Sequence, residues 1–289
     1  MTQIINALSE ISDNYDALFV DLWGCVHNGI RAFDAANAAL AAYRRRGGKV
    51  VLVTNSPRPR ASVERQVDRF GVDRAAWDTI ASSGDSARSA MFQGAVGQNV
   101  YFIGTQGELS FFERLNLLEN PVDIHRVDLE QAEGIVCTGL YTGETPQDYR
   151  APLLYAKQKG LKLLCANPDI VVDRGETREW CAGAIAQDYT DMGGTSLYFG
   201  KPHPPIYDLA RRRLAALGVD IADDRILAIG DGITTDIQGA MGEGIDSLFI
   251  TGGLAAQETR TQDQPDADAL ADYLAKTGYD PKYSIGFLR

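Results

Sequence analysis

Short apolar runs alternate with amphipathic segments along most of the chain. Segments such as DAANAALAAYRRRGG and PRASVERQVDRFG carry apolar residues at helical spacing. The runs between such segments have the length and the β-branched character of strands, as in LFVD, KVVLVTN, NVYFIGT, GIVCTG and LKLLCAN. Because strands that alternate with helices form parallel sheets, this order predicts an α/β fold with a mostly parallel sheet.

Residues at the ends of the amphipathic segments predict where the helices begin and end. We expect Asp34 to cap the first helix, and Gly47 with Gly48 to end it after a basic last turn. A later helix should run from about Pro205 to Leu217 and end at Gly218. Further helices are expected from about Thr235 and within TQDQPDADALADYLAKTG.

The strand patterns fall into two groups that predict two domains. The alternation of strand-like and helical segments seen at the beginning of the chain recurs near its end, in SLYFGKP, RILAIGDG and DSLFITGG. The stretch between these groups, about 86–192, holds strand patterns with helices of their own. We therefore expect a core made of residues 1–85 and 193–289, with residues 86–192 inserted as a second α/β domain.

Composition narrows the class of protein. The chain is 45% hydrophobic, as in soluble globular proteins, and its apolar runs are far shorter than the roughly 18 residues of a membrane span. The stretch MTQIINALSE lacks the features of a secretory signal, so we expect a cytoplasmic protein that does not enter a membrane. The net charge of -11 makes binding to nucleic acid unfavourable.

The four cysteines are widely spaced and include no CxxC pair. This spacing predicts reduced thiols in the core rather than disulfides or a zinc site. They are Cys25, Cys137, Cys165 and Cys181.

Polar residues follow four of the predicted strands. They are Asp21 after LFV, Thr54-Asn55-Ser56 after VVLV, Lys201 after SLYFG, and Asp231 after ILAIG. Ligands of open parallel sheets bind beyond the carboxyl ends of the strands, and parallel strands would bring all four exits to one edge. Each residue alone could also be an ordinary turn or helix cap, but the coincidence of four favours a site.

Two nucleotide-binding motifs are excluded. GTSLYFGKP resembles a phosphate-binding loop, but five residues separate its glycines and Pro202 stands where Ser or Thr should follow the lysine. No GxGxxG opens a helix after the first strand, so a dinucleotide site lacks its phosphate turn.

The ordered set DLWG, TNS, GKP and GDGITTD resembles the haloacid dehalogenase (HAD) superfamily. The insertion between TNS and GKP, with the segment NPDIVVDRG, resembles its class IIA branch, the sugar-phosphate and p-nitrophenyl-phosphatase-like group. The resemblance implies a doubly wound, Rossmann-like core with an inserted type 2 α/β cap. It also implies Mg2+ and hydrolysis of a small phosphorylated metabolite through an aspartyl-phosphate.

The resemblance also implies roles for individual residues. Asp21 would be the nucleophile and a metal ligand, and Thr54 would hydrogen-bond the transferring phosphoryl group. Lys201 would offset negative charge, Asp231 would hold Mg2+ and Asp236 would support it from the same loop. A carboxylate can approach a phosphate only where a cation and fixed donors neutralise the growing charge, which these residue types supply.

Trp23 departs from the family pattern, which has a second aspartate two residues after the nucleophile. The backbone carbonyl of Trp23 can still bind Mg2+, but an indole cannot exchange a proton near pH 7. Losing a general acid/base typically lowers the reaction rate by a factor of about 10² to 10⁴, but substrates with good leaving groups are spared. His27 could replace it as proton carrier or be structural, whereas His203 is expected to be structural and His125 to lie in the cap.

The substrate itself is not specified by the sequence. Asn55 and Ser56, beside the phosphoryl site, and Asn167 and Asp169, in the cap, are the residues expected to contact it, although an Asn-Pro-Asp turn would explain the last two equally well. The oligomeric state is open, a homodimer included.

Two other functions stay open. The protein could bind phosphate and metal for regulation without turnover, because Trp23 has replaced the acid/base. It could also be a metal-independent dehalogenase, whose nucleophile is followed by an aromatic residue, although Asp231 and Asp236 would then repel Asp21 with no cation between them.

Overall fold

The computed structural model describes residues 2–114, 120–174 and 177–289. Contacts divide the chain into two compact units. The first comprises 1–54, 64–81 and 207–289, and the second comprises 55–63 and 82–206.

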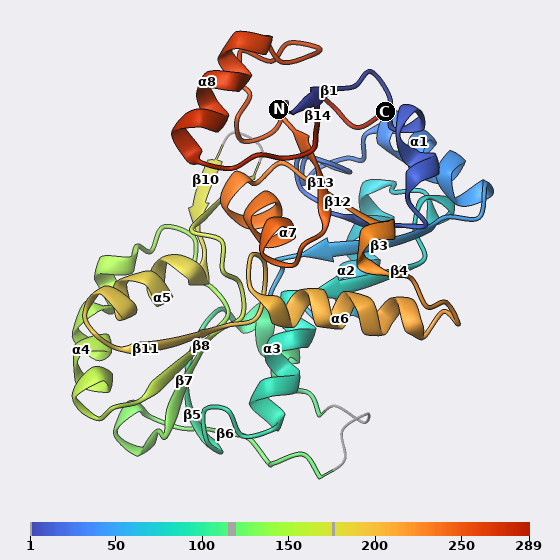
Figure 1. Ribbon diagram of the computed structural model, residues 1–289. Coiled ribbons are helices and arrows are strands. Elements are labelled where there is room, and N and C mark those ends of the chain that lie inside the picture. The colour runs from blue at the N-terminus through green and yellow to red at the C-terminus, as the bar shows by residue number, and fades with distance from the viewer. Residues whose placement is uncertain (1, 115–119, 175–176) are drawn as a thin grey trace. The chain divides into compact units, whose positions relative to one another are not determined.

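The first unit is built on a mostly parallel sheet. Within the described residues it has seven strands in the order β1-β14-β13-β12-β2-β3-β4 (Figure 1). The strands are β1 (Gln3–Ile4), β2 (Ala17–Val20), β3 (Lys49–Thr54), β4 (Thr79–Ser82), β12 (Ile226–Gly230), β13 (Asp246–Ile250) and β14 (Tyr283–Ile285). The first and last strands of the chain are neighbours, because β1 pairs with β14 in parallel.

Helices accompany these strands along the chain. They are α1 (Asp34–Arg45), α2 (Arg60–Phe70), α6 (Pro204–Ala215), α7 (Gln238–Gly242) and α8 (Ala267–Thr277). Every residue of β2 and of β12 is buried, as expected for central parallel strands that are covered on both faces.

The strand order creates a switch point between β2 and β12. These two strands are parallel neighbours, with Ala17 opposite Ile226 and Val20 opposite Ile229. The chain continues from β2 to β3 on one side and from β12 to β13 on the other. The carboxyl ends of β2 and β12 therefore frame the crevice where such sheets bind ligands.

The helix ends agree with the sequence except at one cap. The predicted cap at Asp34 is wrong: Phe33 occupies the capping position and Asp34 is the first helical residue. Its carboxylate lies in the first turn, where the helix dipole favours a negative charge. At the other end, Gly47 has φ +100°, a left-handed conformation that ends the helix as predicted.

The second unit has a five-stranded sheet and a small hairpin among its described residues. The sheet order is β11-β8-β7-β5-β6, and all of its pairings are parallel. Its strands are β5 (Asn99–Ile103), β6 (His125–Arg126), β7 (Gly134–Cys137), β8 (Lys162–Cys165) and β11 (Thr195–Tyr198), and the antiparallel pair is β9 (Val171–Arg174) with β10 (Thr177–Trp180).

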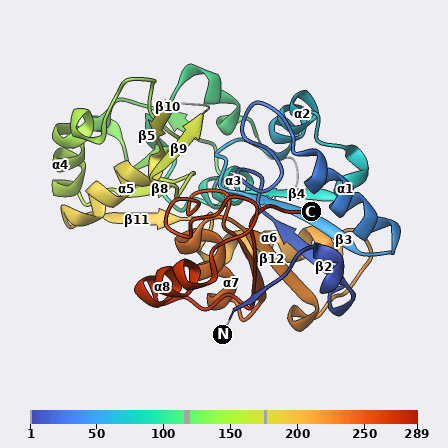
Figure 2. The ribbon, with the colours of Figure 1, turned by 90° about the horizontal axis from the view of Figure 1, so that it is seen from above.

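Helices bury both faces of this second sheet. They are α3 (Ser83–Phe92), α4 (Arg150–Gln158) and α5 (Ala182–Asp191), and Figure 2 shows α5 beside β8 and β11. Alternate residues of β7 enter different clusters: Ile135 and Cys137 pack with residues of α4 and α5, whereas Val136 packs with residues of α3. This alternation is the two-sided burial that parallel strands require.

One strand lies in a different sheet from the one predicted. The run SLYFG was expected to return to the core sheet, but β11 pairs with β8 in the second unit. The expectation that all four polar exits share one sheet edge is therefore wrong for Lys201, which follows β11. In the described part of the chain, no helix is both long enough and apolar enough to cross a membrane.

Candidate active site

Asp21 and Asp231 lie at the carboxyl ends of β2 and β12. The backbone N–H of Asp21 donates to the carbonyl of Ile229 at 2.8 Å, so the ladder between the strands extends to the site. Asp21 is 8% exposed and Asp231 is 7% exposed. Two buried carboxylates at neighbouring strand ends repel each other unless a cation or a proton lies between them.

A third side chain joins this pair. The thiol of Cys25 and one carboxylate oxygen each from Asp21 and Asp231 all lie within 4.8 Å of one another. Cys25 was expected in the core, and it is buried as predicted, with 1% exposure. Its position beside the carboxylates was missed.

The backbone closes around Asp231. Gly24 has φ +71°, and a Cβ atom there or at Gly253 would overlap Oδ2 of Asp231. The same oxygen accepts a hydrogen bond from the backbone N–H of Leu254 at 3.1 Å. Only glycine at Gly24 and Gly253 therefore lets the chain hold this carboxylate so closely.

The donor set fits a hard divalent cation. Mg2+ prefers oxygen ligands, usually one or two carboxylates together with water and phosphate. Asp21 and Asp231 supply two such groups. Because both are buried, they attract a cation more strongly than they would in water.

Asp236 holds the loop that carries Asp231. It lies in a π-helical turn, Ile233–Ile237, and its Oδ2 accepts a hydrogen bond from the backbone N–H of Gly232 at 3.1 Å. Asp236 is not a member of the converging group of Asp21, Cys25 and Asp231 that the described residues form. The supporting role expected from the sequence stays a prediction.

Trp23 and His27 pack together in the loop after β2. Their ring centroids are 5.3 Å apart in an edge-to-face arrangement, and His27 packs in the same way on Phe70 at 4.9 Å. The backbone N–H of Gly29 donates to Nδ1 of His27 at 3.0 Å. Burial lowers the pKa of His27 to about 4, so its ring is neutral at pH 7. This environment favours the structural interpretation of His27 over a role as proton carrier.

The other predicted site residues divide between the two units. Thr54 is the buried last residue of β3, and Ser56 lies in the turn that follows, where its hydroxyl accepts a hydrogen bond from the N–H of Arg58 at 3.3 Å. His203 stacks on Tyr198, with ring centroids 4.8 Å apart, and burial lowers its pKa.

Asn55 joins two of the predicted residues. Its Nδ2 donates to Asp169 Oδ1 at 2.8 Å and to the Lys201 carbonyl at 3.1 Å, while its Oδ1 accepts from the Lys201 N–H at 2.7 Å. Asn167 Oδ1 accepts a hydrogen bond from the N–H of Asp169 at 3.1 Å, which is the turn that the Asn-Pro-Asp sequence predicts. The second unit thus brings Asn55, Asn167, Asp169 and Lys201 together.

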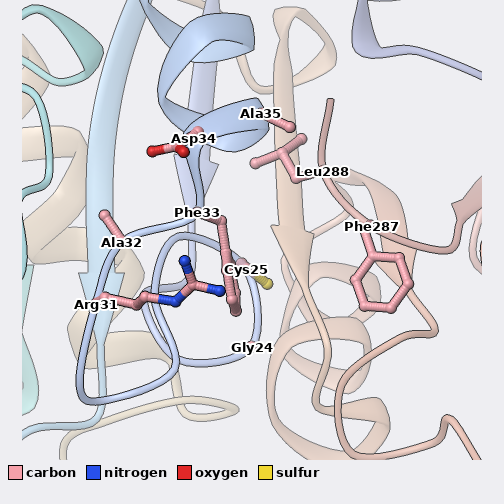
Figure 3. Close-up of a pocket in the computed structure, with 9 residues that line it drawn as sticks. All are labelled: Gly24, Cys25, Arg31, Ala32, Phe33, Asp34, Ala35, Phe287 and Leu288. Atoms are coloured by element: carbon pink, nitrogen blue, oxygen red, sulfur yellow. The ribbon is translucent and has the colours of Figure 1, made fainter.

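A pocket of about 350 Å3 opens in the first unit beside Gly24 and Cys25 (Figure 3). Arg31 contributes a cationic side chain to it, and Phe33 and Phe287 contribute aromatic rings. Its other lining residues are Ala32, Asp34, Ala35 and Leu288.

A doubly wound parallel sheet with buried carboxylates at its switch point defines an α/β protein that binds its ligand at the strand ends. Comparison identifies the family. Models of haloacid dehalogenase-like hydrolases match residues 18–117 and 198–277. The crystal structure of a haloacid dehalogenase-like hydrolase from Brucella suis is 38% identical, with 99% of this chain and 100% of that chain covered and a TM-score of 0.85. The chain belongs to the haloacid dehalogenase-like hydrolase family.

More distant structures share the fold. A possible sugar phosphatase of the HAD superfamily from Cytophaga hutchinsonii is 18% identical, with 99% of this chain and 98% of that chain covered and a TM-score of 0.76. A glycerol phosphate phosphatase from Mycobacterium tuberculosis, solved with magnesium, is 23% identical, with 84% of this chain and 70% of that chain covered and a TM-score of 0.63. No curated protein matches the chain.

Proposed function

We propose that this hydrolase is a Mg2+-dependent phosphohydrolase that acts on a small phosphorylated metabolite through an aspartyl-phosphate on Asp21. The observation that carries the proposal is the convergence of the buried carboxylates of Asp21 and Asp231 at neighbouring strand ends. The names of the similar structures, a sugar phosphatase and a glycerol phosphate phosphatase with magnesium, support the substrate class and the metal.

Asp21, Asp231 and the backbone carbonyl of Trp23 are the proposed Mg2+ ligands, and Asp236 fixes the loop of Asp231. When bound, Mg2+ offsets the charge of the phosphate and of the nucleophile. The glycines at Gly24 and Gly253 keep Asp231 oriented, as their close approach to its carboxylate indicates.

The proposed reaction has two steps. A carboxylate oxygen of Asp21 bonds to phosphorus, the ester bond between phosphorus and the leaving oxygen breaks, and that oxygen takes up a proton. Water then attacks the acyl phosphate, which restores the carboxylate and releases phosphate. Thr54 would hydrogen-bond the phosphoryl oxygens, and Lys201 would offset their charge. The role of Lys201 rests on the family resemblance alone.

Trp23 restricts the range of substrates in this proposal. No carboxylic acid follows the nucleophile at the position that would protonate the leaving oxygen, and His27 is buried and neutral. The leaving groups of acyl, enol and aryl phosphates depart with little help from an acid, so these substrates should react faster than alkyl phosphates.

Selection of the leaving group is assigned to the inserted segment. We propose that 86–192 is the cap on a core of 1–85 and 193–289. Asn167 and Asp169 would contact the substrate from the cap, and Asn55 and Ser56 would contact it beside Thr54. The hydrogen bonds of Asn55 to Asp169 and to the backbone of Lys201 support treating these residues as one group.

The test is hydrolysis of p-nitrophenyl phosphate and acetyl phosphate with Mg2+ and with a chelator. Turnover should require Mg2+, and Asp21→Asn should abolish it because an amide is a poor nucleophile. Asp268→Asn, in the exposed first turn of α8, is the matched control and should keep its activity. Full activity of Asp21→Asn in the folded state would overturn the assignment of the nucleophile.

Trp23 favours a second possible function, in which the protein binds metal and phosphate for regulation without turnover. A protein that kept the cation site but lost turnover would bind Mg2+ with beryllofluoride and hydrolyse neither phosphate. The metal-independent dehalogenase is disfavoured by the buried pair of Asp21 and Asp231, which repel each other without a cation. Release of chloride from chloroacetate in the presence of a chelator would support the dehalogenase instead.

A further inference from the structure

The thiol of Cys25 lies at the cation site but has no role in the proposed function. Its Sγ is within 4.8 Å of a carboxylate oxygen of Asp21 and of one of Asp231. The residue is almost fully buried, at 1% exposure, and it is not part of a disulfide. Any cation that binds between the two carboxylates therefore meets sulfur as well as oxygen.

The loop after β2 holds this thiol in place. The backbone N–H of Val26 donates to the carbonyl of Leu22 at 2.9 Å, and the N–H of Gly24 donates to the carbonyl of His27 at 3.0 Å. These hydrogen bonds close a tight turn around Cys25. The backbone at Cys25 is thus held by hydrogen bonds on both sides, which limits the positions that its sulfur can take.

Sulfur changes which ions such a site prefers. Thiolates are soft ligands that favour Zn2+ and related ions, whereas Mg2+ favours oxygen. A site with two carboxylates alone would discriminate weakly among divalent cations. Adding Cys25 gives thiophilic ions one strong bond that Mg2+ cannot match.

We propose that Cys25 is a third protein ligand for thiophilic divalent cations at the site of Asp21 and Asp231, so that Zn2+ and Cd2+ displace Mg2+ there. This inference rests on the proposed function, which assigns Mg2+ to the same two carboxylates. On binding, Sγ forms a bond to the ion and the thiol proton passes to solvent.

A pocket opens beside the loop that carries the thiol. Cys25 is one of its lining residues, and the volume of about 350 Å3 has room for a hydrated ion. Figure 3 shows Cys25 with its sulfur atom at this pocket, together with Arg31 and Phe33.

The test is titration of the metal-free protein with Cd2+, followed by the ultraviolet absorption band of the cadmium–thiolate bond. Wild type should show a saturable band, and excess Mg2+ should weaken Cd2+ binding. Cys25→Ser should lose the band and at least about tenfold in Cd2+ affinity, with a smaller change for Mg2+. Cys181→Ser is the matched control and should keep the band, because Cys181 is not a member of the converging group of Asp21, Cys25 and Asp231 found among the described residues. Asp231→Asn should weaken Cd2+ binding together with Mg2+ binding.

A band that survives in folded Cys25→Ser, or that excess Mg2+ does not weaken, would overturn the inference. If the serine variant fails to fold, Cys25→Val provides the same test. Mg2+-dependent turnover without a Cys25-dependent band would refute only this inference. A Cys25-dependent band in a protein with no Mg2+-dependent turnover would refute only the proposed function.

Discussion

Acidification should destabilise the fold through His27. This side chain is 1% exposed, and burial lowers its pKa from 6.5 to about 4. The unfolded chain therefore takes up a proton below pH 6.5, whereas the folded protein does not until about pH 4. The stability contributed by the neutral buried ring is complete above pH 6.5 and is lost as the pH falls from there toward 4.

The size of the effect follows from the shift. Each unit of pKa difference is worth about 1.4 kcal/mol, so a fall in pKa from 6.5 to about 4 corresponds to about 3 kcal/mol in all. The slope should steepen as the pH falls below 6.5 and be greatest about midway between the two pKa values, and between pH 6.5 and pH 5 His27 alone should cost about 2 kcal/mol. Such a loss is a large part of the stability of an ordinary domain.

Urea unfolding at several pH values measures this contribution. The chelator EDTA should be present, so that only the protein's own groups titrate. His27→Gln should be less stable than wild type near pH 7, since it loses the ring contacts with Trp23 and Phe70. The informative quantity is the change of the free energy of unfolding with pH, which should be flatter in His27→Gln.

The exposed His125 provides the control, because His125→Gln should keep the wild-type pH dependence. His203, whose pKa burial also lowers, is present in all three proteins and cancels from the comparison. Equal pH dependence in wild type and His27→Gln would refute the reasoning. It would mean that the ring is charged in the folded protein or that water reaches it.

Two further predictions concern the site. If only the proton carrier is missing, Trp23→Asp should raise the rate of hydrolysis of alkyl phosphates by a factor of up to about 10² to 10⁴. Assays on an alkyl and an aryl phosphate would show whether the gain is confined to the substrate with the poorer leaving group. Gly253→Ala should weaken Mg2+ binding at least about tenfold, as measured by calorimetry, since its methyl group would overlap Oδ2 of Asp231. Gly242→Ala is the matched control, because a Cβ atom there meets nothing within 4 Å. Unchanged Mg2+ affinity in Gly253→Ala would show that the backbone does not position this carboxylate.

The sequence predicted the two strand ends that carry Asp21 and Asp231. Each aspartate follows a continuous apolar run, and the carboxyl ends of parallel strands were expected at one edge of the sheet. The parallel pairing of β2 with β12 confirms a shared edge for these two residues. The prediction for β11 was wrong because an apolar run identifies a strand but not the strand beside it.

Cys25 was missed for a different reason. A small apolar residue after a strand is most often part of the core, and its burial agrees with that interpretation. Its approach to Asp231 depends on the left-handed conformation of Gly24, at φ +71°, which turns the chain back toward the end of β12. The glycine in DLWGC permits this turn but does not by itself predict which side chain it brings to the site.

The packing of Trp23 explains why an aromatic residue can occupy the position of the acid/base. Its indole lies directly beneath Gly29, where a Cβ atom would overlap the ring, and it contacts His27 edge-on. The loop after β2 is thus built around Trp23, and an aspartate there would leave this space unfilled. Trp23→Asp therefore makes two changes at once, since it supplies a proton carrier and removes a packing element. A gain in rate together with a fall in melting temperature would indicate that Trp23 stabilises the loop at the expense of proton transfer. A gain in rate without loss of stability would contradict the packing role of the indole.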